Sequence, residues 1–324
     1  MSLTVLGEQK NKIDALASDT ILSVNEWSKI ILDSLKPPPG PYAFFNHNSH
    51  LLERVKDVRK ILTRLFDNRI KLRTLDEEIE RFRQTEKTNR SEKSNEVFRN
   101  SHITNEYLQL DFECLYIFGN TMLDQLSLCL AYSIGIQEPQ NITYNKLVKL
   151  LEDEENQPFL LELWSNNKFD ILWLFGQLRF YRNKFIIHPN RPWQRGNTHT
   201  IYGHDFNLFT PSPPGWLENE EEIIKQIRDL LPLAPKWLQE ADEDYWEKSS
   251  PRALLDRLLQ NLGNVESKKD RNTILELVSL YGTTTPTFQL IGEKLLSLVN
   301  ESSKSAVKYN SNNTSIINLG NPKK

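Results

Sequence analysis

The sequence predicts a mainly α-helical fold. Glycine is scarce, with 12 residues among 324, and apolar residues recur at intervals of three and four along almost the whole chain. Hydrophobic residues make up 38% of the chain, which is enough for the core of one large domain or two ordinary ones. We therefore expect a helical bundle, with a short β-hairpin or an ordered loop at residues 198–210, where apolar residues alternate weakly.

Charge and cysteine content exclude several classes of protein. Forty Lys and Arg stand against 43 Asp and Glu, so no protein-wide positive field attracts nucleic acid, and any such contact is local. Cys114 and Cys129 lie in an apolar helical run, which predicts packed free thiols rather than disulfides or a zinc site. Charged residues interrupt every apolar stretch, including the first thirty residues. We expect no signal peptide, no membrane span and a cytoplasmic protein.

Two long helices are expected in an N-terminal region, residues 1–100, that packs on the rest of the bundle. Apolar spacing predicts the first over residues 8–36, ended by the proline-rich stretch "KPPPGPY". The second is expected over residues 51–95. Its later part is densely charged with both signs, which is typical of a solvated helix face rather than of a nucleic-acid contact.

The central region, residues 101–215, is expected to hold the core helices. The segment 104–134 is apolar around most of its circumference, which predicts a helix at the centre of the bundle. Thr143 is a candidate N-cap for a short helix that ends at Leu151. A further helical pattern begins at Pro158, with a break expected near residues 165–167, and stops at His188-Pro189.

The C-terminal part is expected to divide in two. Residues 216–300 show about four short helical patterns, several of which start with proline, as suits a first helical turn. Residues 301–324 are rich in Ser, Asn and Lys, which predicts a disordered tail.

The stretch "LRFYRNKFIIHPNRPWQRG", residues 178–196, combines groups that suit phosphoryl chemistry. On an ideal helix the side chains of Arg182 and His188 would point about 120° apart. Pro189 pushes His188 out of the α region, so that its imidazole can turn toward the same cleft as Arg182. Histidine exchanges protons near neutral pH, arginine offers a fork of donors to phosphate, and Asn183 can orient either. The trio suits attack of a ribose 2′-hydroxyl on phosphorus.

"RNKFIIH" resembles the R-x(4-6)-H motif of the HEPN superfamily, whose arginine is commonly followed by a polar residue. The resemblance covers about residues 104–191. It implies a helical bundle that acts as a metal-independent endoribonuclease without a cofactor, in a toxin–antitoxin or other defence setting. It also implies a homodimer with the site at the interface, RNA as substrate and an antitoxin or other regulatory protein as partner. Some HEPN toxins carry tyrosine two residues after the histidine, where this chain has Asn190, so regulation at that tyrosine is not expected.

The resemblance further implies a supporting acidic residue on an earlier core helix. Asp124 is the first candidate and Glu113 the second. Successive spacings of 4, 3 and 4 residues, through Ile117 and Asn120, place both acids on one face of helix 104–134. Carboxylates on so apolar a helix need partners, which the basic residues of the motif region can supply. Asp111 lies on a different stripe near the expected helix start, where a carboxylate is favourable in any case.

A basic and aromatic group surrounds the motif. Two cations and one stacking face next to the site can bind single-stranded RNA, although arginine stacked on tryptophan also stabilises ordinary loops. The expected RNA-binding residues are Arg179, Arg191, Trp193 and Arg195.

The sequence motifs of several other enzyme classes are absent. The chain has no Gly-rich phosphate loop, no H-E-x-x-H and no G-x-S-x-G. His199, His204 and Asp205 are too few and too isolated to indicate a metal site, so no metal is expected. The alternative to the ribonuclease is a catalytically silent HEPN-like helical protein that binds a partner protein or nucleic acid. In that case Arg182 pairs with a core carboxylate and His188 caps the helix end.

Overall fold

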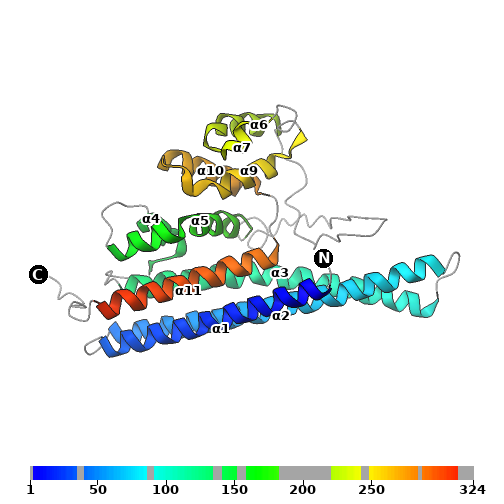
Figure 1. Cartoon of the computed structure of the whole chain (residues 1–324), viewed down its shortest axis with the longest axis horizontal. Coiled ribbons are helices and arrows are strands. Elements are labelled where there is room, and N and C mark those ends of the chain that lie inside the picture. Colours follow the sequence, from blue (N-terminus) through cyan, green and yellow to red (C-terminus); the bar gives the residue numbers. More distant parts are fainter. Residues whose placement is uncertain are drawn as a thin grey trace, which may run out of the picture.

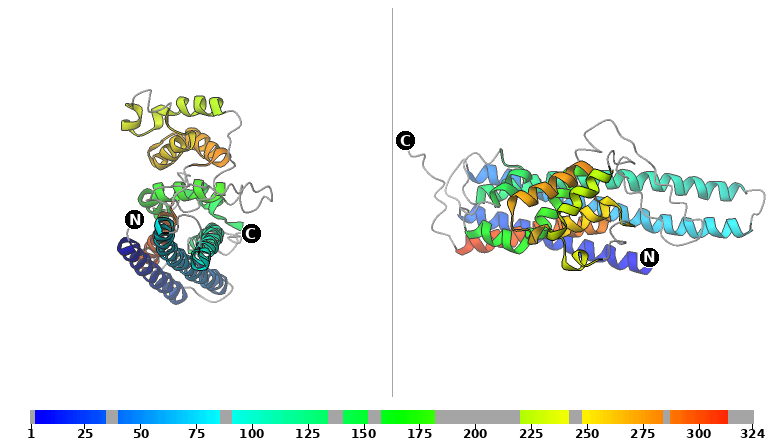
Figure 2. Two further views of the ribbon diagram at one scale, coloured as in Figure 1. Left: turned by 90° about the vertical axis from the view of Figure 1, so that its right-hand side faces the viewer. Right: turned by 90° about the horizontal axis from the view of Figure 1, so that it is seen from above.

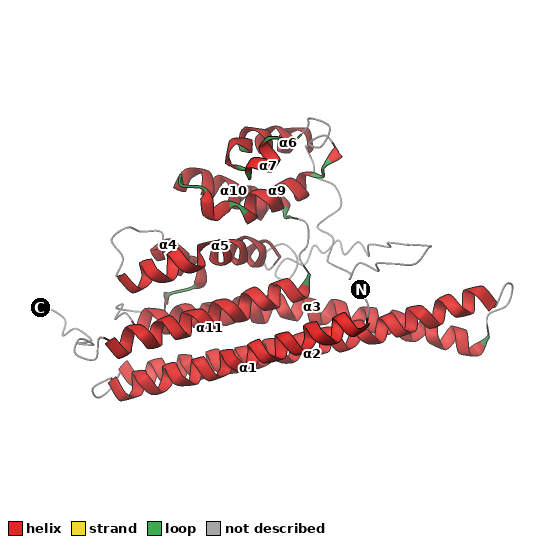
Figure 3. Ribbon diagram, in the orientation of Figure 1, coloured by secondary structure: helices red, strands yellow, loops and turns green. Residues whose placement is uncertain are grey.

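The fold is mainly α-helical, as the sequence predicts. The computed structural model describes residues 3–34, 40–85, 91–133, 141–151, 158–181, 220–241, 248–283 and 287–312, and these contain helices and no strand (Figure 3). The residues of the expected hairpin, 198–210, lie outside the described part of the chain. None of the described helices is long and apolar enough to cross a membrane.

Four long helices form the base of the molecule (Figure 1). Helix α2, Gly40–Thr85, and helix α3, Glu92–Ser133, make an antiparallel pair, and α1, Leu3–Ser34, lies along α2. Helix α11, Phe288–Asn312, is the last described helix and packs beside α1, α3 and α2. The first and last described helices are therefore neighbours in one core.

Further helices stack on this base in layers (Figure 2). Helix α4, Tyr144–Leu151, and helix α5, Pro158–Tyr181, lie on α3 and α11. Helices α9, Pro251–Gln260, and α10, Lys268–Tyr281, cover α5, and α6, Glu220–Asp229, packs on α9. The remaining short elements are α7, Lys236–Gln239, and two 3-10 helices, Leu231–Leu233 and Leu262–Asn264. One hydrophobic cluster runs through all these layers.

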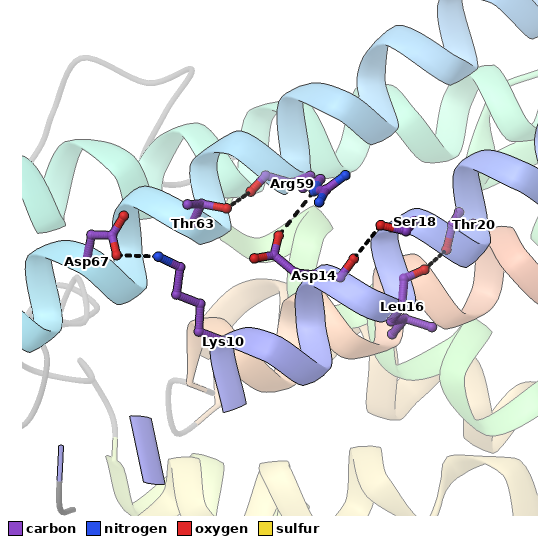
Figure 4. A network of polar contacts seen from close by, with 8 residues as sticks. All are labelled: Lys10, Asp14, Leu16, Ser18, Thr20, Arg59, Thr63 and Asp67. Atoms are coloured by element: carbon purple, nitrogen blue, oxygen red, sulfur yellow. Dashed lines mark hydrogen bonds and ion pairs between the residues drawn. The ribbon is translucent and has the colours of Figure 1, made fainter. Parts of the chain in front are cut away.

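Ion pairs join α1 to α2 along their exposed edge (Figure 4). Lys10 Nζ lies 2.5 Å from Asp67 Oδ1, and Arg59 Nε donates to Asp14 Oδ1 at 3.1 Å. These pairs are partly exposed, so each stabilises the fold by well under about 1 kcal/mol. Their main effect is to fix the register of α1 on α2.

The α2–α3 pair extends beyond α1 as a two-helix arm (Figure 1). Its seam follows the alternating three- and four-residue spacing of a coiled coil. Many seam residues on α3 are small or polar, which lets the two helices approach closely. The buried seam residues are Leu72 and Ile79 of α2 and Ser94, Val97, Ser101, Thr104 and Leu108 of α3.

Asp76 makes the stability of the arm depend on pH. Burial raises the pKa of this carboxyl to about 6, against the opposing charges of Arg69, Arg73 and Arg83. Because the folded state binds the proton more tightly than the unfolded chain, the protonated carboxyl stabilises the fold below about pH 4. This contribution is lost as the pH rises through about 6.

We therefore expect Asp76→Asn to raise the free energy of unfolding at about pH 8 by roughly 1 kcal/mol, after allowance for solvent screening. Near pH 4 the variant and the wild type should be equally stable. Urea unfolding at the two pH values measures the difference, and an equal effect at both would contradict the assignment.

Helix boundaries in the first half differ from those expected. The predicted helix over residues 51–95 is wrong at both ends, because α2 spans Gly40–Thr85. Helix α3 begins at Glu92 rather than near residue 104. Residues 92–103 look solvated in sequence, but Ser94, Val97 and Ser101 are buried against α2. The position of the expected domain boundary, residue 100, lies inside the continuous helix α3.

The disordered tail expected at residues 301–324 is wrong for residues 301–312, which continue α11. Small side chains allow this polar stretch to pack closely, and Ser302, Ser303 and Ala306 are fully buried. Ser23 Oγ of α1 donates to Asn300 Oδ1 at 2.7 Å in the same interface. Residues 313–324 lie outside the described part of the chain.

The expected break at residues 165–167 is absent, and α5 is continuous. Ser165 and Asn166 are exposed, so their polar side chains need no break in the helix. Asn167 Nδ2 donates back to the carbonyl of Leu163 at 3.1 Å, within the helix. The short helix predicted after Thr143 is confirmed as α4, and Thr143 Oγ1 accepts from the Lys146 backbone N–H at 3.5 Å.

Candidate functional site

The predicted catalytic motif begins directly after α5. Arg179 belongs to α5, but its side chain is outside the described part of the structure. The structure therefore describes the helix that precedes the motif. The predicted residues that lie wholly beyond the described range are Arg182, Asn183, His188, Arg191, Trp193 and Arg195.

The end of α5 is fixed to the segment that follows α10. Gln177 Nε2 donates to Thr283 Oγ1 at 2.7 Å, and both side chains are buried. The Phe180 ring packs on Gly282, where an added Cβ would lie 2.5 Å from ring atoms. Gly282 has φ of 76°, and its N–H caps α10 by donating to the Val278 carbonyl at 2.8 Å. Only glycine meets both requirements without strain.

The middle of α5 is held by contacts with α4 and α11. Tyr144 Oη of α4 donates to the Ile171 carbonyl at 2.8 Å. Asp170 forms an ion pair with Lys294 of α11, whose ammonium also lies 5.3 Å from the centre of the Trp173 ring. All side chains from residue 171 to 178 are buried. Helix α5 is therefore a closely packed core element over residues 171–178.

Asp124, the first predicted supporting acid, caps helix α4. Its Oδ1 accepts the backbone N–H of Tyr144 at 2.8 Å, and its Oδ2 accepts from Asn120 Nδ2 at 3.1 Å. The carboxylate thus satisfies an N–H of the first helical turn, which has no partner within the helix. Glu113 lies half-buried on α3, eleven residues earlier.

We expect Asp124→Ala to lower the free energy of unfolding by about 0.5–2 kcal/mol, the usual range for loss of a helix cap. Asp124→Asn keeps an oxygen acceptor and should lose less. Urea unfolding of both variants measures the ranking, and equal stability of all three proteins would contradict the capping role. Because Asp124→Asn removes the charge and keeps the cap, its cleavage rate reports separately on a catalytic role.

Asp111 is a buried carboxylate that was expected near the start of a helix. It lies in the interior of α3, and not near its start, because α3 begins at Glu92. Arg64 of α2 forms an ion pair with Asp111 Oδ1, and Asn68 Nδ2 lies 3.4 Å from Oδ2. Burial raises the pKa of Asp111, while Arg64 and Asn68 oppose the shift. The seam spacing of the α2–α3 pair, which places residue 111 toward α2, is the signal that could have identified it.

The cysteines and histidines in the described part of the chain suggest no catalytic centre. Both cysteines are free thiols, as predicted, with Cys129 fully buried and Cys114 half-buried. His47 is half-buried, its Nδ1 lies 3.2 Å from Gln125 Oε1, and its ring stacks on Tyr132. The described residues contain no group of three side chains able to hold a metal ion. The sequence candidates His199, His204 and Asp205 lie outside them.

Comparison with known proteins adds no relative. The chain matches no protein-family model, no curated protein and no solved structure. The resemblance to the HEPN superfamily therefore stays a prediction from the motif.

Proposed function

We propose that this protein is a metal-independent endoribonuclease of the HEPN type. The observation that carries the proposal is that the Arg182-Asn183-x4-His188 motif follows directly after α5, near whose end Leu178 and Phe180 are buried. Phe180 and Gln177 fix that end to residues 282–283. A catalytic pair needs such support, because small displacements of catalytic groups are costly in rate.

The chemistry is an internal transfer within the RNA strand. His188 accepts the proton of a ribose 2′-hydroxyl, whose oxygen attacks the adjacent phosphorus. The bond from phosphorus to the 5′-oxygen breaks, and that oxygen takes up a proton from an imidazolium. Arg182 donates to the phosphoryl oxygens as charge builds on them, and Asn183 orients either group. The products are a 2′,3′-cyclic phosphate and a 5′-hydroxyl.

The residues around the motif complete the proposed site. Arg191 and Arg195 neutralise RNA phosphates, Trp193 stacks on a base, and Arg179, three residues before Arg182 in the chain, adds a further positive charge. Asp124 and Glu113 are the supporting acids. We further propose that two copies of the chain combine their motifs in a homodimer, and that an antitoxin or another protein controls the activity in a toxin or defence system.

Cleavage of defined RNA in EDTA tests the proposal. We expect the purified protein to cut a labelled single-stranded RNA and to leave a 2′-O-methyl RNA of the same sequence intact, because that RNA lacks the attacking hydroxyl. Binding of the 2′-O-methyl RNA, measured in parallel, shows whether it reaches the site. If folded protein binds RNA and cuts neither substrate, the silent binding protein is the better account.

A further inference from the structure

Helix α3 carries an exposed apolar stripe on its outer side. Tyr107 and Leu110 are each 55% exposed and Ile117 is 39% exposed, with half-buried Cys114 between them. Their spacing of three, four and three residues aligns them on one face of the helix. Among the described helices, α3 packs on α2, α11, α4 and α5, and these neighbours leave Tyr107, Leu110 and Ile117 exposed. Figure 2 shows α3 at the edge of the long-helix layer.

A row of cations borders the stripe on its α2 side. Asp111 follows Leu110 by one residue and contacts Arg64 and Asn68 of α2. These contacts show on which side of the stripe α2 lies. They also show that Arg64 lies beside residue 111 along the length of α3. Lys60 and Lys71 share the exposed face of Arg64, four residues before it and seven after it, and the one acidic residue at this spacing, Asp67, is paired with Lys10 of α1. Arg64 remains 58% exposed despite its ion pair. This basic edge therefore runs beside the whole stripe.

Acidic residues border the stripe on the opposite side. Glu106 and Glu113 precede Tyr107 and Cys114 by one residue each, which places them about 100° round α3, away from α2. Lys71 lies two turns from Arg64 toward the tip of the arm, close to the level of Glu106, and Arg64 lies close to the level of Glu113. The two edges thus carry opposite charges at matching heights.

We infer that this stripe is the docking surface for a second copy of the chain, packed parallel to the first about a two-fold axis along α3. In that arrangement Tyr107, Leu110 and Ile117 each pack against the same residue of the second copy. The acidic edge of each copy faces the basic edge of the other, so that Glu106 meets the partner's Lys71. In an antiparallel pair like edges would meet, Glu against Glu and Arg against Arg, which disfavours that arrangement.

This surface serves the homodimer on which the proposed activity rests, although only the stripe and its charged edges point to it. Oligomeric state and RNA cleavage are measured separately. A dimer without cleavage would contradict the proposed function and leave the interface standing. Cleavage by a monomer would contradict the interface and leave the ribonuclease activity standing.

Light scattering and analytical ultracentrifugation of the full chain test the surface. We expect a dimer, and a rise in the dissociation constant of roughly 100-fold for Leu110→Glu. Leu22→Glu is the matched control, because Leu22 is an exposed leucine, 66% accessible, on α1. It should leave the dimer unchanged. A monomeric wild type, or equal dimerisation of the two folded variants, would overturn the inference.

Charge reversal and thiol cross-linking test the parallel arrangement. Lys71→Glu should weaken the dimer roughly tenfold, and adding Glu106→Lys should restore it. Cys129 is fully buried, so mild oxidation should link two copies through Cys114 alone. In a Cys114→Ser background, Ile117→Cys should link as well. An antiparallel pair can bring only one of these two positions to its axis, so linkage at one alone would contradict the inference.

Discussion

Replacing His188 by alanine is expected to lower the rate of RNA cleavage by about 10²–10⁴-fold, the usual contribution of a general acid–base group. The imidazole accepts the 2′-hydroxyl proton, and no neighbouring side chain replaces it in the proposed scheme. Initial rates on a labelled RNA in EDTA measure the loss. The matched control is His102→Ala, which removes an exposed histidine of the arm whose Nδ1 lies 3.3 Å from Glu106.

Arg182→Ala belongs to the same prediction and should lose cleavage over a similar range, because charge on the phosphoryl oxygens is then left without its donor. Arg83→Ala, at an exposed arginine of the arm, controls for the loss of a positive charge. Unfolding curves of all four variants should match the wild type within about 0.5 kcal/mol. Full activity of either motif variant would remove the motif from the mechanism.

Trp27→Ala is expected to have the largest effect on stability, a loss of about 3–5 kcal/mol. The ring is fully buried, lies edge-on to Phe44 with centroids 5.5 Å apart, and donates from Nε1 to Ser133 Oγ at 3.2 Å. Truncation leaves a large cavity where α1, α2 and α3 meet and removes that hydrogen bond. Urea unfolding measures the change.

Two further variants separate the causes. Trp27→Phe keeps most of the packing and loses the hydrogen bond, so its cost should be about 1–2 kcal/mol. Leu22→Ala shortens an exposed side chain on the same helix and should change stability by less than about 0.5 kcal/mol. If Trp27→Ala were as mild as Leu22→Ala, α1 would not belong to the core as described.

The core helices could be predicted because their apolar residues repeat with the helical period. The capped helix α4 after Thr143 and the apolar run of α5 follow from local sequence alone. The start of α3 could not be found this way, because Ser94, Ser101 and Thr104 resemble loop residues until a partner helix covers them. The same holds for Ser302, Ser303 and Asn310, which made the end of α11 look disordered.

For polar residues, too, only part of the structural role can be predicted from the sequence. Asp124 and Glu113 could be placed on one face of a helix from their spacing, but the capping of α4 by Asp124 depends on a chain segment twenty residues away. The burial of Asp111 could not be predicted, because its carboxylate is paired with Arg64, forty-seven residues earlier. Spacing assigns a residue to a face, whereas its partner follows only from how the helices pack.

The ends of the cleaved RNA test most directly whether Arg182 and His188, which follow α5 in the sequence, form a ribonuclease that uses the 2′-hydroxyl. Mass spectrometry of the fragments formed in EDTA should show a 2′,3′-cyclic phosphate and a 5′-hydroxyl. A single 2′-deoxy substitution at the cut site should abolish that cut. Fragments that end in a 3′-hydroxyl and a 5′-phosphate, or the same fragments from His188→Ala, would contradict the account.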